Sequence, residues 1–253
     1  MKYFITSDVH GFYSILKKEL DKQGFDINNP EHILVIVGDA FDRGQEAKKL
    51  LNYLTKLKKL NKLIYIKGNH ESCMEKLLTQ LQKHEPISLY HLHNKTLDTL
   101  SQLTGISQFD LMCDYYNYEK DIIPKMKKYL KLTKDLPYYY EIGDHILTHG
   151  YIPIDVKTMS QLKKASKQAW ESAMWFNGMQ QWHLGQRIKG KTIVVGHFHT
   201  SFGNYLYHKL GSGEFENDSV FSPFIDKQII ALDACTAWTK KINIVVIIQE
   251  VVL

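Results

Sequence analysis

The chain has 253 residues, 44% hydrophobic and 23% charged, which is enough for a soluble globular protein to bury a substantial core without disulfide or metal crosslinks. Its apolar runs are all shorter than the roughly 20 residues that a membrane-spanning helix needs. The formal net charge of +5 comes mainly from lysine, because Arg43 and Arg187 are the only arginines. A basic surface so poor in arginine argues against a nucleic-acid groove.

Strand and helix signals alternate along the first third of the chain. The apolar runs 2–7, 32–37 and 63–67 predict buried strands. The spacing of apolar residues predicts helices from the turn at 8–11 to about Gln23, over 45–60 and over 71–83. This order predicts an α/β fold in which the crossover helices cover a largely parallel sheet.

Strand signals are absent from residues 84–136, which are rich in leucine, lysine and tyrosine. We interpret this segment as a helical cap insertion within a single domain that spans residues 1–253. Beyond Pro137, strands are predicted at 138–142 and 145–148 around the hairpin turn Gly143-Asp144. The remaining predictions are helical structure over 158–183, a strand at 192–195, a surface loop over 203–224, and strands at 228–232 and 242–249.

Five apolar segments each stop at residues that can bind a metal ion. These residues are Asp8 and His10, Asp39, Asn69 and His70, His149, and His197 with His199. Because ligands gather at the carboxyl ends of strands in an α/β sheet, we expect one shared site. Imidazole nitrogens and oxygen ligands without thiolates favour Mn²⁺, Fe or Zn²⁺, and two such ions can activate water against a phosphoryl group. The pattern predicts a dinuclear metal site for phosphate-ester cleavage.

Other interpretations apply to single motifs. Glycine, aspartate and asparagine favour turns, so any one strand-ending motif could be a simple turn; the motifs together are harder to explain that way. His91-x-His93 has metal-ligand spacing but lies in the cap without carboxylates, and we interpret it as a polar helix face. The three cysteines show neither metal-knuckle nor disulfide spacing, and the N-terminus lacks a signal-peptide leader. We therefore expect a cytoplasmic protein.

Three motifs make the pattern specific: Asp8-x-His10-Gly11, Gly38-Asp39-x-x-Asp42-Arg43-Gly44 and Gly68-Asn69-His70-Glu71. Leu136-Pro137, His149-Gly150, Gly196-His197 and residues 230–233 follow in the matching order. Together they resemble the phosphoprotein phosphatase family of calcineurin-like metallophosphoesterases, in its bacterial and phage form. The resemblance covers nearly the whole chain, with 84–136 matched least. It implies a central mixed β-sandwich flanked by helices.

The resemblance also implies a role for each motif residue. Two divalent metal ions, Mn²⁺ foremost, would be held by Asp8, His10 and Asp39 at the first site and by Asp39, Asn69, His149 and His197 at the second. His70 would be the general acid, oriented by Asp42, and Arg43 would grip the substrate phosphate. Asn69 would also contact substrate, and Arg187 is a candidate for a second phosphate ligand.

The chain departs from the family pattern at two places. Gly196-His-Phe-His199 contains a second histidine, as in the wider superfamily, so His199 is a further candidate ligand of the first metal. Asp233-Ala-Cys-Thr236 stands where the family usually has Asp-Thr-Gly. Both departures leave the expected chemistry in place and leave the substrate open.

The expected activity is hydrolysis of phosphomonoesters, foremost phosphoserine or phosphothreonine in proteins, by a hydroxide held between the two metal ions. The alternative is symmetrical hydrolysis of diadenosine tetraphosphate or a related dinucleoside polyphosphate at the same centre. The expected partner is thus a phosphorylated protein or a nucleotide, without nucleic acid or membrane, and the oligomeric state is open. A nuclease is disfavoured because Asp42-Arg43-Gly44 resembles the monoesterase branch. A non-catalytic binding module is disfavoured because every expected ligand is present.

Overall fold

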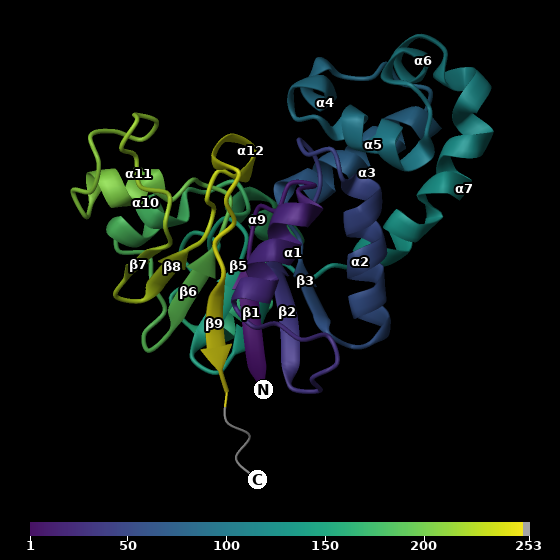
Figure 1. Ribbon diagram of the computed structural model, residues 1–253. Helices are drawn as coiled ribbons and strands as arrows, with labels where there is room; N and C mark the ends of the chain where they lie inside the picture. The colour runs from purple at the N-terminus through teal and green to yellow at the C-terminus, as the bar shows by residue number, and fades with distance from the viewer. Residues whose placement is uncertain (250–253) are drawn as a thin grey trace.

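The computed structural model describes residues 1–249, without the side chains of residues 115, 116 and 119. Two mixed β-sheets form its centre (Figure 1). The first has the order β3-β2-β1-β9, with β1 (Lys2–Thr6), β2 (His32–Val37) and β3 (Leu63–Ile66) parallel and β9 (Val245–Ile248) antiparallel to β1. The second has the order β4-β5-β6-β8-β7. In it, β5 (His145–Thr148), β6 (Thr192–Val195) and β8 (Ile229–Ala231) are parallel, and β4 (Tyr139–Ile142) and β7 (Phe224–Asp226) are antiparallel edge strands.

The expected mixed β-sandwich is confirmed, with two sheets in place of the one that the alternation of strands and helices predicted. Side chains alternate across each strand, so every central strand faces two layers. In β1, Ile5 packs into the layer between the two sheets, whereas Phe4 packs against helices. In β6, Val194 faces the other sheet and Val195 faces helices. Burial on both faces explains why these strands read as continuous apolar runs.

Helices cover the outer face of each sheet. The first sheet is covered by α1 (Tyr13–Lys22), α2 (Ala47–Lys59) and α3 (Asn69–Gln82), as predicted. The second is covered by α8 (Met159–Lys164), α9 (Lys167–Ala173), α10 (Gly178–His183) and α11 (Ser201–Leu206). The helical stretch predicted over 158–183 is three short helices, because Thr158, Ser166 and Asn177 each cap a new helix with their side chains. The loop predicted over 203–224 was wrong at its start, which continues α11, and at Phe224, which begins β7.

Residues 89–133 form four helices beyond the carboxyl ends of β1–β3, at the upper right of Figure 1: α4 (Leu89–His93), α5 (Thr96–Thr104), α6 (Gln108–Cys113) and α7 (Tyr115–Thr133). Leu97, Leu100 and Tyr129 of these helices belong to the same buried cluster as the inner faces of α1–α3. A short helix that the sequence did not predict, α12 (Thr236–Thr239), precedes β9. Within residues 1–249, no helix is both long enough and apolar enough to cross a membrane.

Candidate metal centre

The strand-end residues of both sheets come together in the structure. The side chain of Asn69, the first residue of α3, is central: its Oδ1 lies 2.9 Å from His149 Nε2 and 2.9 Å from His197 Nδ1. The carboxylate of Asp39 lies 3.2 Å from His149 Nε2, and that of Asp8 lies 3.9 Å from His10 Nε2. All of these side chains are buried except that of His197, which is partly exposed.

Two groups of side chains have the geometry of metal sites. One contains His10, Asp39 and His70, and the other contains Asp39, His149 and His197. The possible ligand atoms within each group lie within 4.8 Å of one another. Asp39 belongs to both groups, so its carboxylate lies where a ligand shared by two ions would have to be.

The imidazoles present lone pairs to the cluster. His10 Nδ1 donates to the Phe41 carbonyl at 3.0 Å, and His149 Nδ1 donates to the Val37 carbonyl at 2.9 Å. A carbonyl only accepts, so Nδ1 carries the proton and Nε2 is turned to the cluster. Metal-binding histidines are usually held in this way by a backbone carbonyl behind the ring. His197 donates to the Trp175 backbone carbonyl and is held similarly. Burial together with His149 lowers the pKa of His197 to about 3, which keeps its ring neutral.

The donor set fits divalent cations. Burial would lower the pKa of His149, but the carboxylates of Asp39 and Asp8 raise it to about 10, so this position strongly favours positive charge. Asn69 Oδ1 and an Asp39 oxygen both approach His149 Nε2. Two oxygen acceptors and an imidazole nitrogen can lie this close together only around a positive centre, which is either the proton of a charged imidazole or a metal ion bound to the neutral ring. Oxygen and neutral imidazole ligands suit Mn²⁺, Fe or Zn²⁺.

Glycines allow the functional side chains to lie against the backbone. A Cβ atom on Gly38 would overlap the His149 ring, one on Gly68 would overlap the Asp39 carboxylate, and one on Gly196 would overlap that of Asp8. These three motif glycines are therefore required because the functional side chains lie too close to their backbone for any Cβ atom.

Several cluster residues have left-handed backbone conformations that are unusual for non-glycine residues. The φ angles are 52° at Asp8, 49° at His10, 52° at Asp39, 70° at Asp42 and 67° at His197. Each such residue costs on the order of 1–3 kcal/mol and persists where the surrounding structure holds it. Here the loops hold one another, since Asp8 and His10 donate backbone hydrogen bonds to the carbonyls of residues 38 and 39. Strain concentrated at one cluster is typical of a functional site.

Glu71 is an organising residue to which the sequence analysis gave no role. Its buried carboxylate accepts hydrogen bonds from the backbone amides of Asp39 (3.0 Å), Ala40 (3.1 Å) and Gly68 (2.8 Å), and from the Tyr65 hydroxyl (2.6 Å). It thereby ties the loop after β2 to the loop after β3. The available signal was its place in the first turn of α3, where a glutamate can satisfy free helix amides.

Replacement of Glu71 is expected to loosen the metal centre. In Glu71→Gln, an amide NH₂ would face backbone N–H groups that need an acceptor. We expect metal affinity to fall about 10- to 100-fold, as for other residues that orient ligands. Isothermal titration of the metal-free protein with Mn²⁺ would measure it, with Glu31→Gln on the exposed surface as the matched control. Equal affinities for the two variants would contradict this role.

Asp42 and His70 form a buried pair at the edge of the cluster. His70 Nδ1 lies 2.7 Å from Asp42 Oδ2, which also accepts from the Thr96 hydroxyl at 2.9 Å. Thr99 accepts from the backbone amide of Asp42, so α5 of the 89–133 helices holds this loop. Burial would lower the pKa of His70, but the carboxylates of Asp39 and Asp42 outweigh burial and raise it. The pair is therefore suited to hold a proton.

Arg43 extends into the same space. Its guanidinium nitrogens lie 3.0 Å from His10 Nε2 and 3.2 Å from His70 Nε2. A guanidinium stays charged and only donates, so both imidazole Nε2 atoms accept from it here, and its planar fork suits an anion that takes their place.

Two other candidate residues are not brought into the cluster. Arg187 donates to the Trp182 carbonyl at 3.2 Å and lies 5.1 Å above the Trp182 ring. His199 Nε2 pairs with Glu214 at 2.6 Å, and its ring contacts that of Phe215. Within residues 1–249, no hydrogen bond or ion pair joins either residue to the metal-ligand candidates. Their proposed roles as phosphate and metal ligands stay predictions.

This fold and site define a metallophosphoesterase. Residues 1–227 match the family model for calcineurin-like phosphoesterases, and the chain belongs to that family.

The chain is also similar to individual proteins of this kind. It is 24% identical to the symmetrical bis(5'-nucleosyl)-tetraphosphatase of Wigglesworthia glossinidia brevipalpis over 64% of this chain and 55% of that protein. It is 29% identical to the asymmetrical bis(5'-nucleosyl)-tetraphosphatase PrpE of Bacillus subtilis over 61% of this chain and 59% of that protein. The chain thus matches less than two thirds of the length of these relatives. A protein serine/threonine phosphatase structure from Saccharomyces cerevisiae shares the fold, with a TM-score of 0.52 and 16% identity over 92% of this chain and 67% of that one.

Proposed function

We propose that this chain hydrolyses phosphomonoesters with the help of two divalent metal ions, Mn²⁺ foremost, and that phosphoserine and phosphothreonine in proteins are its substrate class. The observation that carries the proposal is the buried Asp42–His70 pair, which stands beside Arg43 at the metal centre. An aliphatic alkoxide is a strongly basic leaving group and needs a proton as it departs, and this pair can supply one.

The candidate residues have separate roles in binding the metal ions and in acting on the substrate. One ion would be held by Asp8, His10 and Asp39, and the other by Asp39, Asn69, His149 and His197. When bound, the ions supply an activated water and neutralise charge on the phosphoryl group.

The remaining groups act on the substrate. Arg43 grips two phosphoryl oxygens through its planar fork. Asp42 keeps His70 oriented through Nδ1. When Arg43 turns from His70 Nε2 to the phosphate, Nε2 can carry the proton that His70 gives to the leaving oxygen.

A second candidate is hydrolysis of dinucleoside polyphosphates, which the tetraphosphatase relatives favour. The leaving group would then be a nucleotide, which departs as a stable anion and has less need of His70. Initial rates with phosphoserine peptides, diadenosine tetraphosphate and p-nitrophenyl phosphate, each with Mn²⁺, rank the two directly. Higher kcat/KM for diadenosine tetraphosphate than for every phosphopeptide would overturn the first proposal.

Arg43 is expected to account for phosphate affinity. In Arg43→Lys the charge stays but the bidentate grip is lost, so we expect the inhibition constant of inorganic phosphate to rise about tenfold, and further in Arg43→Ala. The matched control is Arg187→Lys, which changes the only other arginine of the chain. An equal effect of Arg187→Lys would show that the phosphate affinity does not depend on Arg43 in particular.

A further inference from the structure

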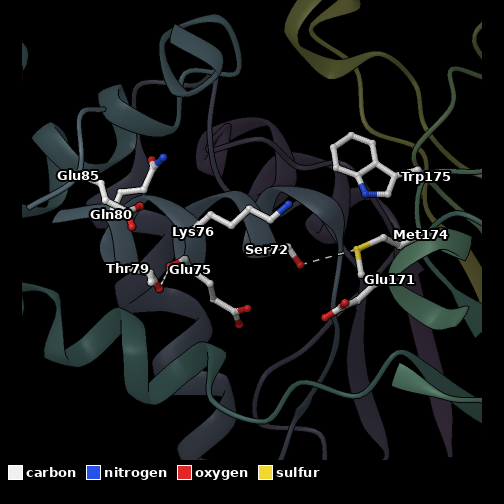
Figure 2. A pocket seen from close by; sticks show the side chains of 9 residues that line it. All are labelled: Ser72, Glu75, Lys76, Thr79, Gln80, Glu85, Glu171, Met174 and Trp175. Atoms are coloured by element: carbon white, nitrogen blue, oxygen red, sulfur yellow. Dashed lines mark hydrogen bonds between the residues drawn. The ribbon is translucent and has the colours of Figure 1, made fainter. Parts of the chain in front are cut away.

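A groove runs beside the metal centre between α3 and the end of α9 (Figure 2). Its cavity volume is about 490 Å³, and its walls include Ser72 and Lys76 of α3 and Trp175 just beyond α9. The groove adjoins the metal centre, because the Trp175 ring meets the ring of His197 edge-on at 5.8 Å between centroids.

The direction of the groove follows from helix geometry. Asn69, Ser72, Lys76 and Thr79 are spaced by three or four residues, so they share one face of α3. At 1.5 Å per residue, the part of this face that lines the groove extends about 10 Å from Ser72 to Thr79. An extended peptide advances about 3.3 Å per residue, so this part has the length of about three peptide residues. The groove is therefore too long for a phosphate group alone and has room for a segment of chain attached to it.

The charged residues of the groove indicate which kind of extended ligand it binds, a polyphosphate or a basic peptide. Its lining includes three glutamates, Glu75, Glu85 and Glu171, and one lysine, Lys76. Figure 2 shows the carboxylates of Glu75 and Glu171 and the ammonium of Lys76 directed into the space between the helices. A chain of phosphates would meet these carboxylates unfavourably, whereas a basic side chain would be attracted to them.

Not all three carboxylates are equally available. Lys67 lies 2.6 Å from Glu75 and largely satisfies it. Glu171 is 3.7 Å from Lys167, but this pair is on the surface, where ion pairs contribute little, so Glu171 can still bind another cation. Among residues 1–249, Glu85 forms no ion pair. Glu171 and Glu85 are therefore the acidic groups that a ligand can use.

Trp175 adds an aromatic surface to this acidic wall. Its side chain is 44% exposed, although it lies next to the metal-ligand candidate His197. Trp175 and Glu171 line the same groove, and a guanidinium can stack on an aromatic ring and pair with a carboxylate, so a long basic side chain suits this groove.

We propose that the groove between α3 and α9 binds the polypeptide on one side of the phosphorylated residue and selects an arginine or lysine there, through Trp175 and Glu171. This inference rests on the proposed phosphoprotein phosphatase function. The groove orients the substrate so that its phosphate reaches Arg43 while the flanking cation lies two to three residues away along the groove.

The test compares phosphoserine peptides that carry arginine, alanine or glutamate on the N-terminal or the C-terminal side of the phosphoserine. The readout is kcat/KM divided by that for p-nitrophenyl phosphate, which is too small to reach along the groove. We expect about a tenfold preference for arginine over glutamate on one side only, the order expected for a cation on an aromatic ring and a partly exposed carboxylate. Glu171→Lys combined with Glu85→Lys should abolish or reverse this preference.

The matched control is Glu31→Lys, which makes the same charge change at an exposed position before β2, and it should keep the preference of the parent protein. Equal normalised rates for all peptides, or a preference that survives in the double variant, would overturn the groove assignment and leave the phosphatase function standing. An increase in diadenosine tetraphosphate hydrolysis in the double variant, with peptide rates unchanged, would assign the groove to a nucleotide. Hydrolysis of p-nitrophenyl phosphate without hydrolysis of any peptide would instead contradict the proposed function itself.

Discussion

His70→Asn is expected to lower kcat on phosphoserine peptides by about 10²- to 10⁴-fold, the usual range for a general acid. The same variant should lose much less on p-nitrophenyl phosphate, because nitrophenolate is a weakly basic leaving group that departs without a proton. The ratio of the two losses, measured under single-turnover conditions, therefore reports proton donation apart from damage to the site.

Metal content decides between the two roles that His70 could have. It lies close enough to His10 and Asp39 to be a ligand, and its Nδ1 is held by Asp42. If His70 is the acid, the variant keeps both ions by elemental analysis. Loss of one ion, with equal effects on the two substrates, would make His70 a ligand instead. His93→Asn, an exposed histidine of α4, is the matched control and should behave as the parent protein.

The convergence of the candidate metal ligands could be predicted because strand ends are easy to locate in this sequence. Five of the strands are short apolar runs with glycine, aspartate or histidine at most two residues after their ends, and parallel strands present their carboxyl ends at one edge. The strand ends converge although the strands form two sheets, because Asp39 of the first sheet and His149 of the second meet at 3.2 Å.

The contacts that hold the centre in place could not be predicted, because their partners are distant in the chain. The Glu71 carboxylate meets the amide of Asp39, which is 32 residues away, and no local pattern shows which loop a glutamate will bind. The Thr96 hydroxyl reaches Asp42 across 54 residues, from a helical segment whose sequence suggested only a cap. The left-handed conformations at Asp8 and Asp39 follow from these interlocking loops, and residue type could not locate them, because aspartate adopts this conformation more often than most residues but at few of its positions.

His199 also shows that distant contacts cannot be predicted from a local motif. The His197-x-His199 spacing is local and favours a ligand, but the orientation of the ring depends on Glu214, in a segment that was predicted only as surface loop. The spacing of residues in a motif indicates which side chains could reach a metal ion. A contact with a residue elsewhere in the chain then determines how each of these side chains is oriented.

Asp39→Asn is expected to remove at least one metal ion and to lower kcat by about 10²- to 10³-fold or more, the range for loss of one major electrostatic group in an active site. Asp39 is shared by both candidate metal groups. Burial alone would raise the pKa of its carboxyl, but His149 and His70 outweigh burial and hold that pKa well below its usual value, so the charge is present for an ion to bind.

Asparagine keeps the volume of this side chain and an Oδ1 that can still accept from the His70 amide, which lies 2.9 Å from it in the parent protein. The fold should therefore persist while the charge is lost, and circular dichroism of the metal-free protein checks this. Asp144→Asn, which changes a carboxylate that is 85% exposed on the hairpin between β4 and β5, is the control for the chemistry of the substitution. Two ions per chain in Asp39→Asn, measured by elemental analysis after dialysis, would show that Asp39 does not bridge them, because a neutral amide presents one weak oxygen ligand where the carboxylate presents two charged ones.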